Sequence, residues 1–517
     1  MRQVTRSPNE RERLQMVNVA ANVWSHAEAD PDRVALRSPR GDLTYGQLRD
    51  LSSRAGGAAV AAGLEPLDRV VFIAPSVIEF PVVYYGLHAA GVSVITMNTM
   101  ATAPEIGYVL DDSEASLVIV WHENAGAARA AAADRGLDVW VVGDGAEFEA
   151  EPIASVHDHA PDDTAIILYT SGTTGRPKGV ELTAANLLDT TSSFLPVLAL
   201  TEDDRFGTAL PLFHVYGQAV VMNTVLVTGS SLSLLSPFEP TAMLDMLRRD
   251  RLTALAGVPT MWNAMLHAAA DYGPSDFEHL RLATSGGASL PIEVMRAFNE
   301  RFDCAILEGY GLTESTGAAT FNDINREQKA GTVGPALPGS LIEVRDVMGE
   351  PVAAGVVGEV FIKGPTIMKG YRNRPEATAE DLRDGWLKTG DLGMLDEDGY
   401  LSIVDRAKDL IIRGGYNVYP REVEEVLYEH PDIVEVAVVG VPDDHFGEEV
   451  AAVVALRPGA ELTGEQLRAW AKVQLSAYKV PRLYQFVEAL PKGATGKILK
   501  REIDRDAIRQ ASIGVGA

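Results

Sequence analysis

The chain has 517 residues, of which 46% are hydrophobic and 23% charged, and its formal net charge is −27. That length exceeds what one hydrophobic core supports, so about two to four folding units are expected, and the composition excludes a disordered chain. The negative charge would repel nucleic acid and anionic membrane surfaces, so neither is expected as a partner. Any polyanionic ligand must therefore be held by cations or backbone NH groups that are gathered locally.

Neither end of the sequence carries a recognisable targeting signal. Residues 1–15 are strongly charged and lack the apolar run of a signal peptide, and ASIGVGA is no retention or peroxisomal signal. The most apolar region, residues 70–96, is interrupted by two prolines, a glutamate and a histidine, and so lacks the roughly 20 consecutive apolar residues of a membrane span. We expect a cytoplasmic protein with no transmembrane anchor. Its single cysteine, Cys304, is expected to be a small buried residue.

Over the first 330 residues, apolar runs of strand length alternate with helical patterns. Two helices are expected to begin at capping boxes, Thr44–Gln47 and Thr102–Glu105. Strands are expected at residues 69–74, 115–120, 138–142, 165–170, 231–235, 253–257, 281–285 and 305–309. This βαβ rhythm predicts an α/β fold with doubly wound, parallel sheets.

The pattern changes twice in the second half of the chain. Residues 331–404 hold short β-prone runs between Gly and Pro, which predicts a small antiparallel or barrel-like subdomain. The remainder alternates helices and strands and predicts a separate α+β lid. We therefore divide the chain into an N-terminal domain at 1–404, a hinge at 405–408 and a small mobile C-terminal domain at 409–517.

A loop rich in glycine and hydroxyl groups, YTSGTTGRPKGV, follows the strand that ends near Thr170. Its NH groups and hydroxyls can converge on phosphate oxygens, and Lys178 adds a positive charge. The P-loop pattern of kinases does not fit, because Pro177 and Lys178 precede Gly179. A glycine-rich surface connection is the alternative for such a loop alone. The phosphate-binding candidates are Thr170, Ser171, Gly172, Thr173, Thr174, Gly175 and Lys178.

This loop resembles the phosphate loop of the adenylate-forming superfamily, which includes acyl-CoA synthetases, 4-coumarate ligases, luciferases and peptide-synthetase adenylation domains. Further matching segments follow in order: LPLFHVYG at 210–217, TSGGASLP at 284–291, GYGLTES at 309–315, WLKTGDLG at 386–393, VDRAKDLIIRGGYNVYPREVE at 404–424 and LPKGATGKILKREI at 490–503. The residues of these segments look most like the corresponding motifs of bacterial fatty acyl-CoA ligases.

The resemblance implies that ATP, Mg²⁺ and coenzyme A are bound. Tyr310 is implied to stack on adenine, Thr313 to contact phosphate, and Glu314 to hold Mg²⁺ together with Thr170. Asp391 is implied to accept hydrogen bonds from the ribose hydroxyls. The remaining nucleotide-binding candidates are Gly287, Ala288, Glu308, Gly309, Gly311, Ile403, Arg406 and Lys497.

Three positions near the end of the chain are implied to act in turn. Lys497 resembles the lysine that bridges the substrate carboxylate and the α-phosphate, and we count it as catalytic with Glu314 and Thr170. Lys408 is implied to be a hinge about which the C-terminal domain rotates between two half-reactions. That rotation is implied to bring Gly414 and Gly415 to the incoming thiol.

The sequence offers fewer candidate residues for the site that binds the acid than for the nucleotide site. The resemblance gives His214, Gly286 and Gly309 as candidates for binding the acid or coenzyme A. His214 is equally compatible with a partly buried structural histidine, because no partner is visible in the sequence. Some long-chain ligases carry a tryptophan just beyond this histidine, whereas residues 215–218 read VYGQ, which leaves the chain length of the acid open.

The predicted activity is an ATP-dependent carboxylic acid:CoA ligase. The acid and ATP give acyl-AMP and pyrophosphate, and a thiolate then attacks the acyl-adenylate and expels AMP. A fatty acid is the expected substrate, with an aryl or 4-coumarate-like acid as the alternative. Coenzyme A is favoured as acceptor because little sequence follows Lys497, although a separate carrier protein stays open. A catalytically silent sensor, a luciferase-like oxygenase and a homodimeric assembly also stay open.

Overall fold

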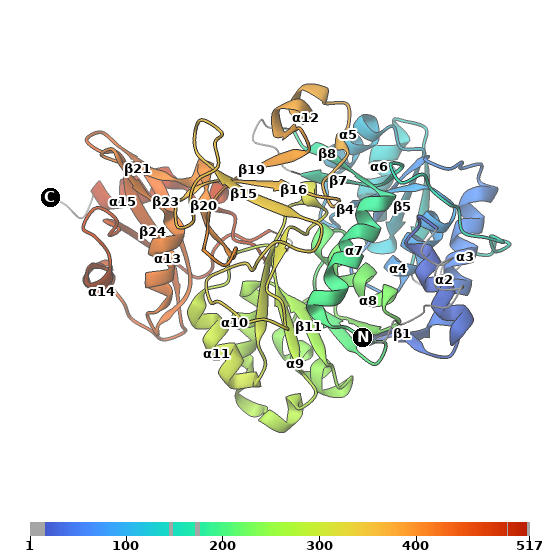
Figure 1. Ribbon diagram of the computed structural model, residues 1–517, viewed down its shortest axis with the longest axis horizontal. Coiled ribbons are helices and arrows are strands. Elements are labelled where there is room, and N and C mark those ends of the chain that lie inside the picture. The colour runs from blue at the N-terminus through green and yellow to red at the C-terminus, as the bar shows by residue number, and fades with distance from the viewer. Residues whose placement is uncertain (1–15, 144–147, 171–175, 494, 514–517) are drawn as a thin grey trace.

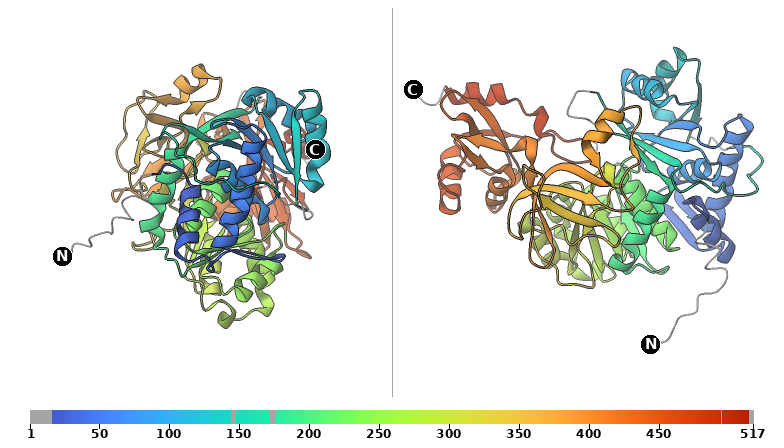
Figure 2. Two further views of the ribbon diagram at one scale, coloured as in Figure 1. Left: turned by 90° about the vertical axis from the view of Figure 1, so that its right-hand side faces the viewer. Right: turned by 45° about the horizontal axis from the view of Figure 1, so that its top comes forward.

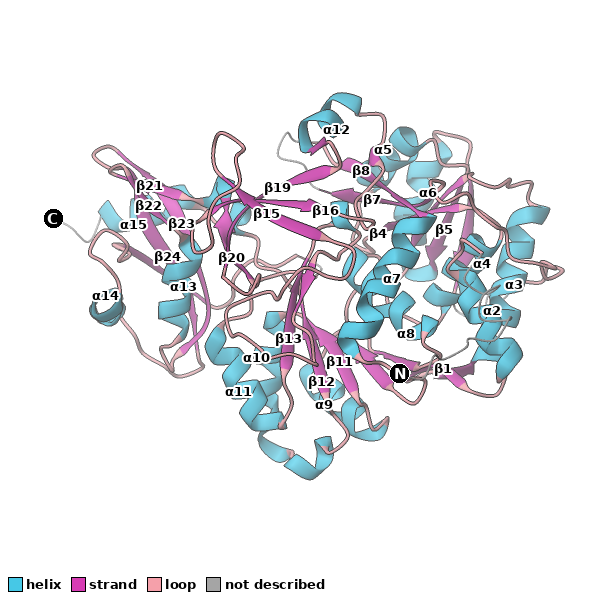
Figure 3. Ribbon diagram, viewed as in Figure 1, coloured by secondary structure: helices cyan, strands magenta, loops and turns pink. Residues whose placement is uncertain are grey.

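The computed structural model describes residues 16–143, 148–170, 176–493 and 495–513. A large N-terminal body and a smaller C-terminal domain lie side by side (Figure 1). The body contains three sheets and the C-terminal domain a fourth. Helices cover the two large sheets of the body (Figure 3). The third sheet of the body lies between these large sheets and the C-terminal domain (Figure 3).

The first large sheet has seven strands in the order β17-β8-β7-β4-β3-β5-β6. Their bounds are β3 Arg69–Ile73, β4 Ser93–Met97, β5 Leu117–Trp121, β6 Asp138–Val142, β7 Thr164–Thr170, β8 Lys178–Thr183 and β17 Gly370–Tyr371. The five strands from β7 to β6 run parallel, and β8 and β17 add antiparallel partners at one edge. The expected parallel sheet is confirmed, with an antiparallel edge added.

Alternate residues of β3 enter two different hydrophobic cores. Val70 and Phe72 belong to one core, and Val71 and Ile73 to another. Side chains alternate across a strand, so this sheet is buried on both faces. The covering helices are α2 Ala20–Ala29, α3 Tyr45–Ala61, α4 Glu79–Ala89, α5 Ala103–Ser113 and α6 Ala125–Ala133, with the short η1 His122–Asn124. The doubly wound arrangement is therefore confirmed.

The second large sheet has eight strands in the order β14-β13-β12-β11-β9-β10-β1-β2. Its strands are β1 Val34–Ser38, β2 Gly41–Thr44, β9 Arg205–Thr208, β10 Ser231–Leu234, β11 Ala254–Gly257, β12 Leu282–Ser285, β13 Ile306–Tyr310 and β14 Thr320–Phe321. Its helices are α7 Ala184–Leu198, the π-helix η2 Tyr216–Met222, α8 Asn223–Val227, α9 Pro240–Arg249, α10 Pro259–Ala268 and α11 Ile292–Phe302, with the short η3 Ala269–Asp271, η4 Pro274–Phe277 and η5 Thr313–Ser315.

The third sheet is antiparallel and has five strands, β15 Leu341–Arg345, β16 Gly358–Lys363, β18 Leu382–Arg383, β19 Trp386–Leu395 and β20 Leu401–Arg406, beside helix α12 Pro375–Asp381. This agrees with the antiparallel interpretation of the β-prone runs. Strand β20 pairs with β19 through Arg406, which lies opposite Asp391. The first two residues of the proposed hinge are therefore paired within this sheet, and the short turn η6 Ala407–Asp409 follows them.

The C-terminal domain has hydrophobic cores of its own. Its sheet contains β21 Ile411–Arg413, β22 Tyr416–Val418, β23 Ile433–Asp443, β24 Gly447–Leu456 and β25 Leu483–Val487. Its helices are α13 Pro420–Tyr428, α14 Gly464–Gln474 and α15 Arg505–Ile513, with the short η7 Lys500–Glu502. Val436 and Val438 enter one core and Ala437 and Val439 another. Separate cores allow this domain to move as a unit, and Figure 2 shows it as a distinct lobe.

Two smaller expectations concern burial and membrane association. Cys304 is buried, and burial raises the pKa of its thiol to about 12, so it is protonated near neutral pH. Within the described ranges, no helix combines the length and apolarity that crossing a bilayer requires.

Candidate active site

The two ends of the predicted phosphate loop lie at the tip of a β-hairpin. Strands β7 and β8 pair antiparallel, with Tyr169 opposite Gly179 and Thr170 opposite Lys178. The loop therefore joins two antiparallel strands and does not lead into a helix. Ser171, Gly172, Thr173, Thr174 and Gly175 lie outside the described residues, so their contacts with phosphate stay a prediction.

Lys178 belongs to a polar cluster beside this hairpin. Its Nζ lies 3.2 Å from Asp381 Oδ2 and 3.9 Å from the centre of the Tyr371 ring. The Tyr371 hydroxyl lies 3.1 Å from Glu314 Oε1 and 3.0 Å from Asp381 Oδ2. Burial raises the pKa of Glu314, and the Tyr371 hydrogen bond and the Lys178 charge oppose that shift. A lysine and a carboxylate from two distant motifs are thus neighbours, joined by two residues that the motifs do not contain.

Asp391 is the centre of a second cluster. Its side chain is 3% exposed, and its Oδ1 accepts an ion-paired hydrogen bond from Arg406 Nε at 2.9 Å. The Tyr310 hydroxyl donates to Asp391 Oδ2 at 2.6 Å. Strand β13 of the second large sheet and strands β19 and β20 of the antiparallel sheet therefore meet here. The structure thus brings together Tyr310, which the resemblance assigned to adenine, Asp391, which it assigned to ribose, and Arg406, a further nucleotide-binding candidate.

The segments after β12 and along β13 form the neighbouring wall. Glu308 is buried, accepts a hydrogen bond from the Leu290 NH at 3.0 Å, and has its pKa raised to about 7 by burial. A Cβ on Gly309 would lie 2.2 Å from a ring carbon of Phe321, so this glycine permits β13 and β14 to approach closely. Gly309 thus has a packing role as well as the ligand-binding role predicted for it.

Lys497 reaches this site from the C-terminal domain. The Lys497 carbonyl accepts the Gly493 NH at 2.9 Å, and Thr260 of α10 donates to the Gly496 carbonyl at 3.2 Å. Partial desolvation by the surrounding protein lowers the pKa of Lys497, as does the charge of Arg406, whereas Asp391 opposes the shift. Within the described part of the chain, the Lys497 ammonium forms no hydrogen bond or ion pair. The Lys497 side chain is exposed to solvent, so an anionic ligand can reach it and pair with it.

His214 lies near Lys497. Burial lowers the pKa of His214 to about 4, and the Lys497 charge contributes further, so the imidazole is neutral near pH 7. Its Nδ1 accepts the Tyr216 NH at 3.3 Å. This contact supplies the partner that the sequence did not reveal and leaves both the structural and the acid-binding interpretations of His214 in place.

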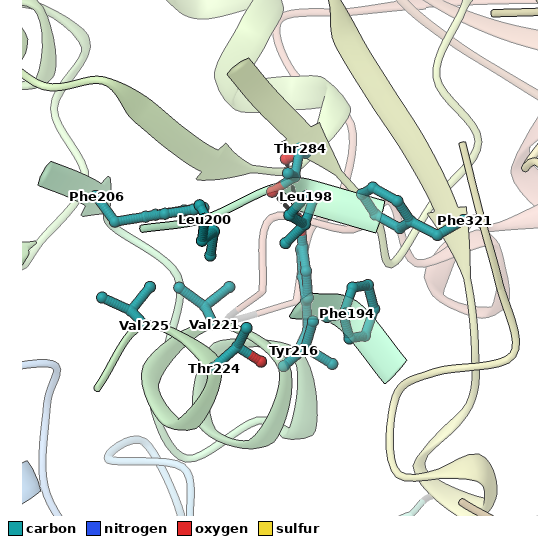
Figure 4. Close-up of a pocket in the computed structure, with 11 residues that line it drawn as sticks. Phe194, Leu198, Leu200, Phe206, Tyr216, Val221, Thr224, Val225, Thr284 and Phe321 are labelled. Carbon is teal, nitrogen blue, oxygen red and sulfur yellow. Dashed lines mark hydrogen bonds between the residues drawn. The ribbon is translucent and has the colours of Figure 1, made fainter. Parts of the chain in front are cut away.

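An apolar slot opens beside Tyr216 (Figure 4). The Tyr216 hydroxyl donates to the Thr284 carbonyl at 3.0 Å, and a Cβ on Gly286 would lie 3.3 Å from the Tyr216 ring. The slot is lined by Phe194, Leu198, Leu200, Phe206, Tyr216, Val220, Val221, Thr224, Val225, Thr284 and Phe321. Apart from Tyr216 and Thr284, which lie in the recognised motifs, these residues were not singled out from the sequence, because the slot is assembled from five distant segments.

The C-terminal domain contacts the body through few polar bonds. Besides the Thr260 bond, Asn263 Nδ2 donates to the Val434 carbonyl at 3.0 Å, and the Ile292 NH donates to Glu425 Oε2 at 3.2 Å. In this orientation Gly414 and Gly415 occupy an exposed turn between β21 and β22. The structure therefore brings Lys497, but not the Gly414–Gly415 turn, to the Asp391 cluster.

Comparisons with known proteins agree with this geometry. The model of the AMP-binding enzyme family matches residues 23–372, and the model of the AMP-binding enzyme C-terminal domain matches residues 422–497. The chain belongs to the AMP-binding enzyme family.

Relatives of this AMP-binding enzyme act on different acids. A feruloyl-CoA synthase of Amycolatopsis sp is 38% identical over 95% of this chain and 99% of that protein. A long-chain-fatty-acid–CoA ligase of Bacillus subtilis is 35% identical over 92% of this chain and 91% of that protein. ATP-bound MatB from Rhodopseudomonas palustris superposes with a TM-score of 0.89 at 34% identity, over 96% of this chain and 99% of that chain.

The AMP-binding enzyme described here is an AMP-forming acyl-CoA synthetase, an ATP-dependent acid:CoA ligase that acts through an acyl-adenylate.

The remaining candidates of this AMP-binding enzyme lie near the two clusters. Thr313 begins η5 and precedes Glu314 directly, and Gly311 packs so closely that its Cβ would lie 2.4 Å from the Gly317 carbonyl carbon. Gly287 and Ala288 follow β12, and Ile403 lies within β20. Their contacts with nucleotide stay predictions.

Replacing Asp391 with asparagine is expected to weaken ATP binding to this AMP-binding enzyme. The amide keeps the shape of the carboxylate but loses one acceptor oxygen and the negative charge, and a hydrogen bond to a charged group contributes about 1.5–3 kcal/mol. The Kd for ATP should therefore rise by about 10-fold or more, as measured by isothermal titration calorimetry. Asp398→Asn, at a carboxylate with 72% side-chain exposure, is the control. Equal ATP affinity in wild type and Asp391→Asn would contradict the ribose assignment.

Proposed function

We propose that this acyl-CoA synthetase activates a fatty acid, whose carboxylate lies beside Lys497 and whose chain enters the slot beside Tyr216. The observation that carries the proposal is the lining of the slot, which includes four aromatic rings and no charged side chain. A second carboxylate or a sulfonate would be buried there without a cation, at a large cost in solvation. An acid with one carboxylate and an apolar body avoids that cost.

The slot must widen to admit such a chain. Its cavity volume is about 10 Å³, close to the space of one water molecule. Four aromatic side chains, including Phe194 and Tyr216, would have to move apart for an acyl chain to enter. The π-helix η2, which carries Tyr216, is a suitable place for such movement because π-helical segments are uncommon and often occur at functional sites.

In the first half-reaction, we assign Lys497 the task of drawing two anions together. The carboxylate of the acid and the α-phosphate of ATP repel each other, and an ammonium without a bonded partner among the described residues can pair with oxygens of both. Asp391 would hold the ribose and so fix the position of the α-phosphate. Lys178 would pair with the other phosphates after leaving Asp381.

Mg²⁺ fits the oxygen atoms of the polar cluster around Glu314. The partly buried Glu314 carboxylate and the Thr170 hydroxyl at the end of β7 are hard oxygen ligands of the kind that Mg²⁺ prefers. When bound there, Mg²⁺ would neutralise charge on phosphate oxygens. Tyr371 would orient the Glu314 carboxylate through its hydroxyl.

In the second half-reaction, we assign coenzyme A to the Gly414–Gly415 turn. That turn is exposed in the present orientation, so the C-terminal domain would have to rotate about Lys408 to bring it to the acyl-adenylate. The domain boundaries at 1–404, 405–408 and 409–517, cytoplasmic residence and a homodimeric assembly belong to the same proposal.

A hydroxylated aromatic acid is the second candidate substrate, and the hydroxyl oxygen of Thr224 favours it. The Thr224 Oγ1 lies in the wall of the slot, is buried, and has no hydrogen-bond partner among the described residues. A phenolic hydroxyl or methoxy group would supply that partner, whereas a saturated chain would not. The relative named as a feruloyl-CoA synthase agrees with this alternative.

A panel of acids assayed with wild type and Thr224→Val separates the two candidates. We expect octanoate and palmitate to give higher kcat/KM values for CoA-thioester formation than ferulate, 4-coumarate or cinnamate, and malonate to give none. Thr224→Val should leave the values for saturated acids unchanged, because valine preserves the volume and removes only the hydroxyl. Thr190→Val is the matched control, since Thr190 Oγ1 is also buried and has no hydrogen-bond partner in the described ranges, but does not line the slot.

Two results would overturn the fatty-acid proposal. If ferulate is preferred and Thr224→Val lowers its kcat/KM by about 10-fold, the aromatic candidate is correct. If malonate is the best substrate, an apolar slot does not select the acid, and both candidates are wrong.

A further inference from the structure

Two histidines and an aspartate converge just before strand β7, outside the site described above. His157, His159 and Asp163 each offer one ligand atom, and these atoms lie within 4.8 Å of one another. The two imidazole rings face each other edge to face, with centroids 4.9 Å apart. Asp163 Oδ2 lies 3.5 Å from His159 Nδ1 and accepts the Ala160 NH at 2.8 Å, which orients the carboxylate.

The ring nitrogens of His159 are buried and poorly satisfied. His159 is 4% exposed, and neither ring nitrogen makes a hydrogen bond of good geometry with the described residues. Nδ1 faces Asp163 Oδ2 at 3.5 Å, whereas no contact partner is found for Nε2 among the described residues. Buried polar atoms in native proteins are almost always paired, so this ring needs an explanation.

A third imidazole lies next to this group. His88 on α4 is 1% exposed, and its Nε2 also has no partner in the described part of the chain. It is close enough to His159 for that residue to contribute to lowering its pKa, although burial is the larger cause. The Asn18 side chain donates to the backbone carbonyls of both His88 and His157, at 2.7 and 2.8 Å, and so holds the two segments together.

We propose that His157, His159 and Asp163 bind one zinc-like divalent metal ion. Two imidazoles and a carboxylate are a donor set typical of zinc. Zinc–nitrogen bonds of about 2.0–2.1 Å place tetrahedral ligand atoms about 3.3 Å apart, so the three side chains, whose ligand atoms now lie within 4.8 Å of one another, would draw together by up to about 1.5 Å. The ion would cross-link residues 157–163 at the entry to β7, the strand that ends at Thr170. The site is structural and independent of the acid that the enzyme activates.

Metal binding to the untagged, full-length protein tests this proposal. The protein is stripped with a chelator and titrated, without nucleotide, with Zn²⁺ by calorimetry and with Co²⁺ by visible absorption. We expect one ion per chain and the intense visible bands of tetrahedral Co²⁺. His159→Asn and Asp163→Asn should each weaken Zn²⁺ binding by about 10-fold or more, since loss of even an outer partner has that effect. His445→Asn, at an exposed histidine of the C-terminal domain, should leave binding unchanged.

Each alternative result decides against the site. If stripped wild-type protein takes up neither ion at micromolar concentrations, or if His159→Asn binds Zn²⁺ as tightly as wild type, the proposal is wrong. The Co²⁺ spectrum of wild type requires no variant, so it remains informative if His159→Asn fails to fold. In that case the more exposed His157→Asn gives the same comparison, and unchanged Zn²⁺ affinity in it would also refute the site.

Discussion

Replacing Lys497 with alanine is expected to reduce acid-dependent pyrophosphate release by about 100- to 1,000-fold, comparable to the loss of one preorganised electrostatic donor in other enzymes. Lys497 is exposed to solvent, its pKa is lowered by partial desolvation and by the Arg406 charge, and its ammonium forms no hydrogen bond or ion pair with the described residues. Alanine would leave the carboxylate and the α-phosphate facing each other without a neutralising charge. Thioester formation from supplied acyl-adenylate should remain within about twofold of wild type, because that step uses the other orientation of the domain.

The two half-reactions are measured separately for this variant. Pyrophosphate release reports the first, and conversion of synthetic acyl-adenylate and CoA to thioester reports the second. Lys472→Ala, at an exposed lysine of α14 in the same domain, is the matched control and should alter neither rate. If Lys497→Ala lowers both rates equally, Lys497 supports the fold of the domain and does not act specifically in adenylation.

Much of the fold follows from local sequence patterns. The strand expected at 138–142 has the same bounds in the structure, and the strands expected at 231–235, 253–257 and 281–285 each differ from it by one residue at one end. The Thr44–Gln47 capping box is also present, with the Gln47 side chain accepting the Thr44 NH at 2.9 Å. These features depend on residues that are close in sequence, where periodicity and turn residues carry the information.

The residues that complete the site could not be predicted in the same way. Tyr371 and Asp381 join Lys178 to Glu314 because β17 pairs with β8, a contact between segments nearly 200 residues apart. Thr224 enters the slot only after η2 and α8 pack near the end of β12. No local pattern encodes such long-range pairings, so motifs located the nucleotide-binding residues and left the acyl-binding residues unidentified.

The domain orientation is a further property that motifs do not contain. The resemblance assigned Lys497 and the Gly414–Gly415 turn to two successive orientations of one domain, and the motifs do not say which of the two the chain adopts. In the structure Lys497 lies near Asp391, and the Gly414–Gly415 turn is exposed. Polar bonds of Thr260, Asn263 and Ile292 with the C-terminal domain, together with the bond from Arg421 to the Ile403 carbonyl, hold this orientation. Few bonds at the interface and separate hydrophobic cores are what a rotating domain requires.

Replacing Lys408 with proline is therefore expected to reduce thioester formation by about 10-fold or more while leaving pyrophosphate release within about threefold of wild type. Lys408 lies in the short 3₁₀ turn η6, a conformation in which φ is about −50 to −70°, and proline fixes φ near −65°. Proline is thus compatible with φ at residue 408 in the present orientation, in which Lys497 is near Asp391. With φ fixed at this residue, the backbone rotation that would bring the Gly414–Gly415 turn inward is opposed.

The matched control is Lys408→Ala, which removes the same side chain but leaves the backbone free. If alanine and proline reduce thioester formation equally, the Lys408 side chain matters and the hinge assignment is wrong. If proline leaves both half-reactions unchanged, the rotation occurs elsewhere, for example after η6. Together with Lys497→Ala, the proline variant gives opposite effects on the two steps. General destabilisation would lower both rates in both variants, so opposite effects would require two orientations of one domain, each serving one half-reaction.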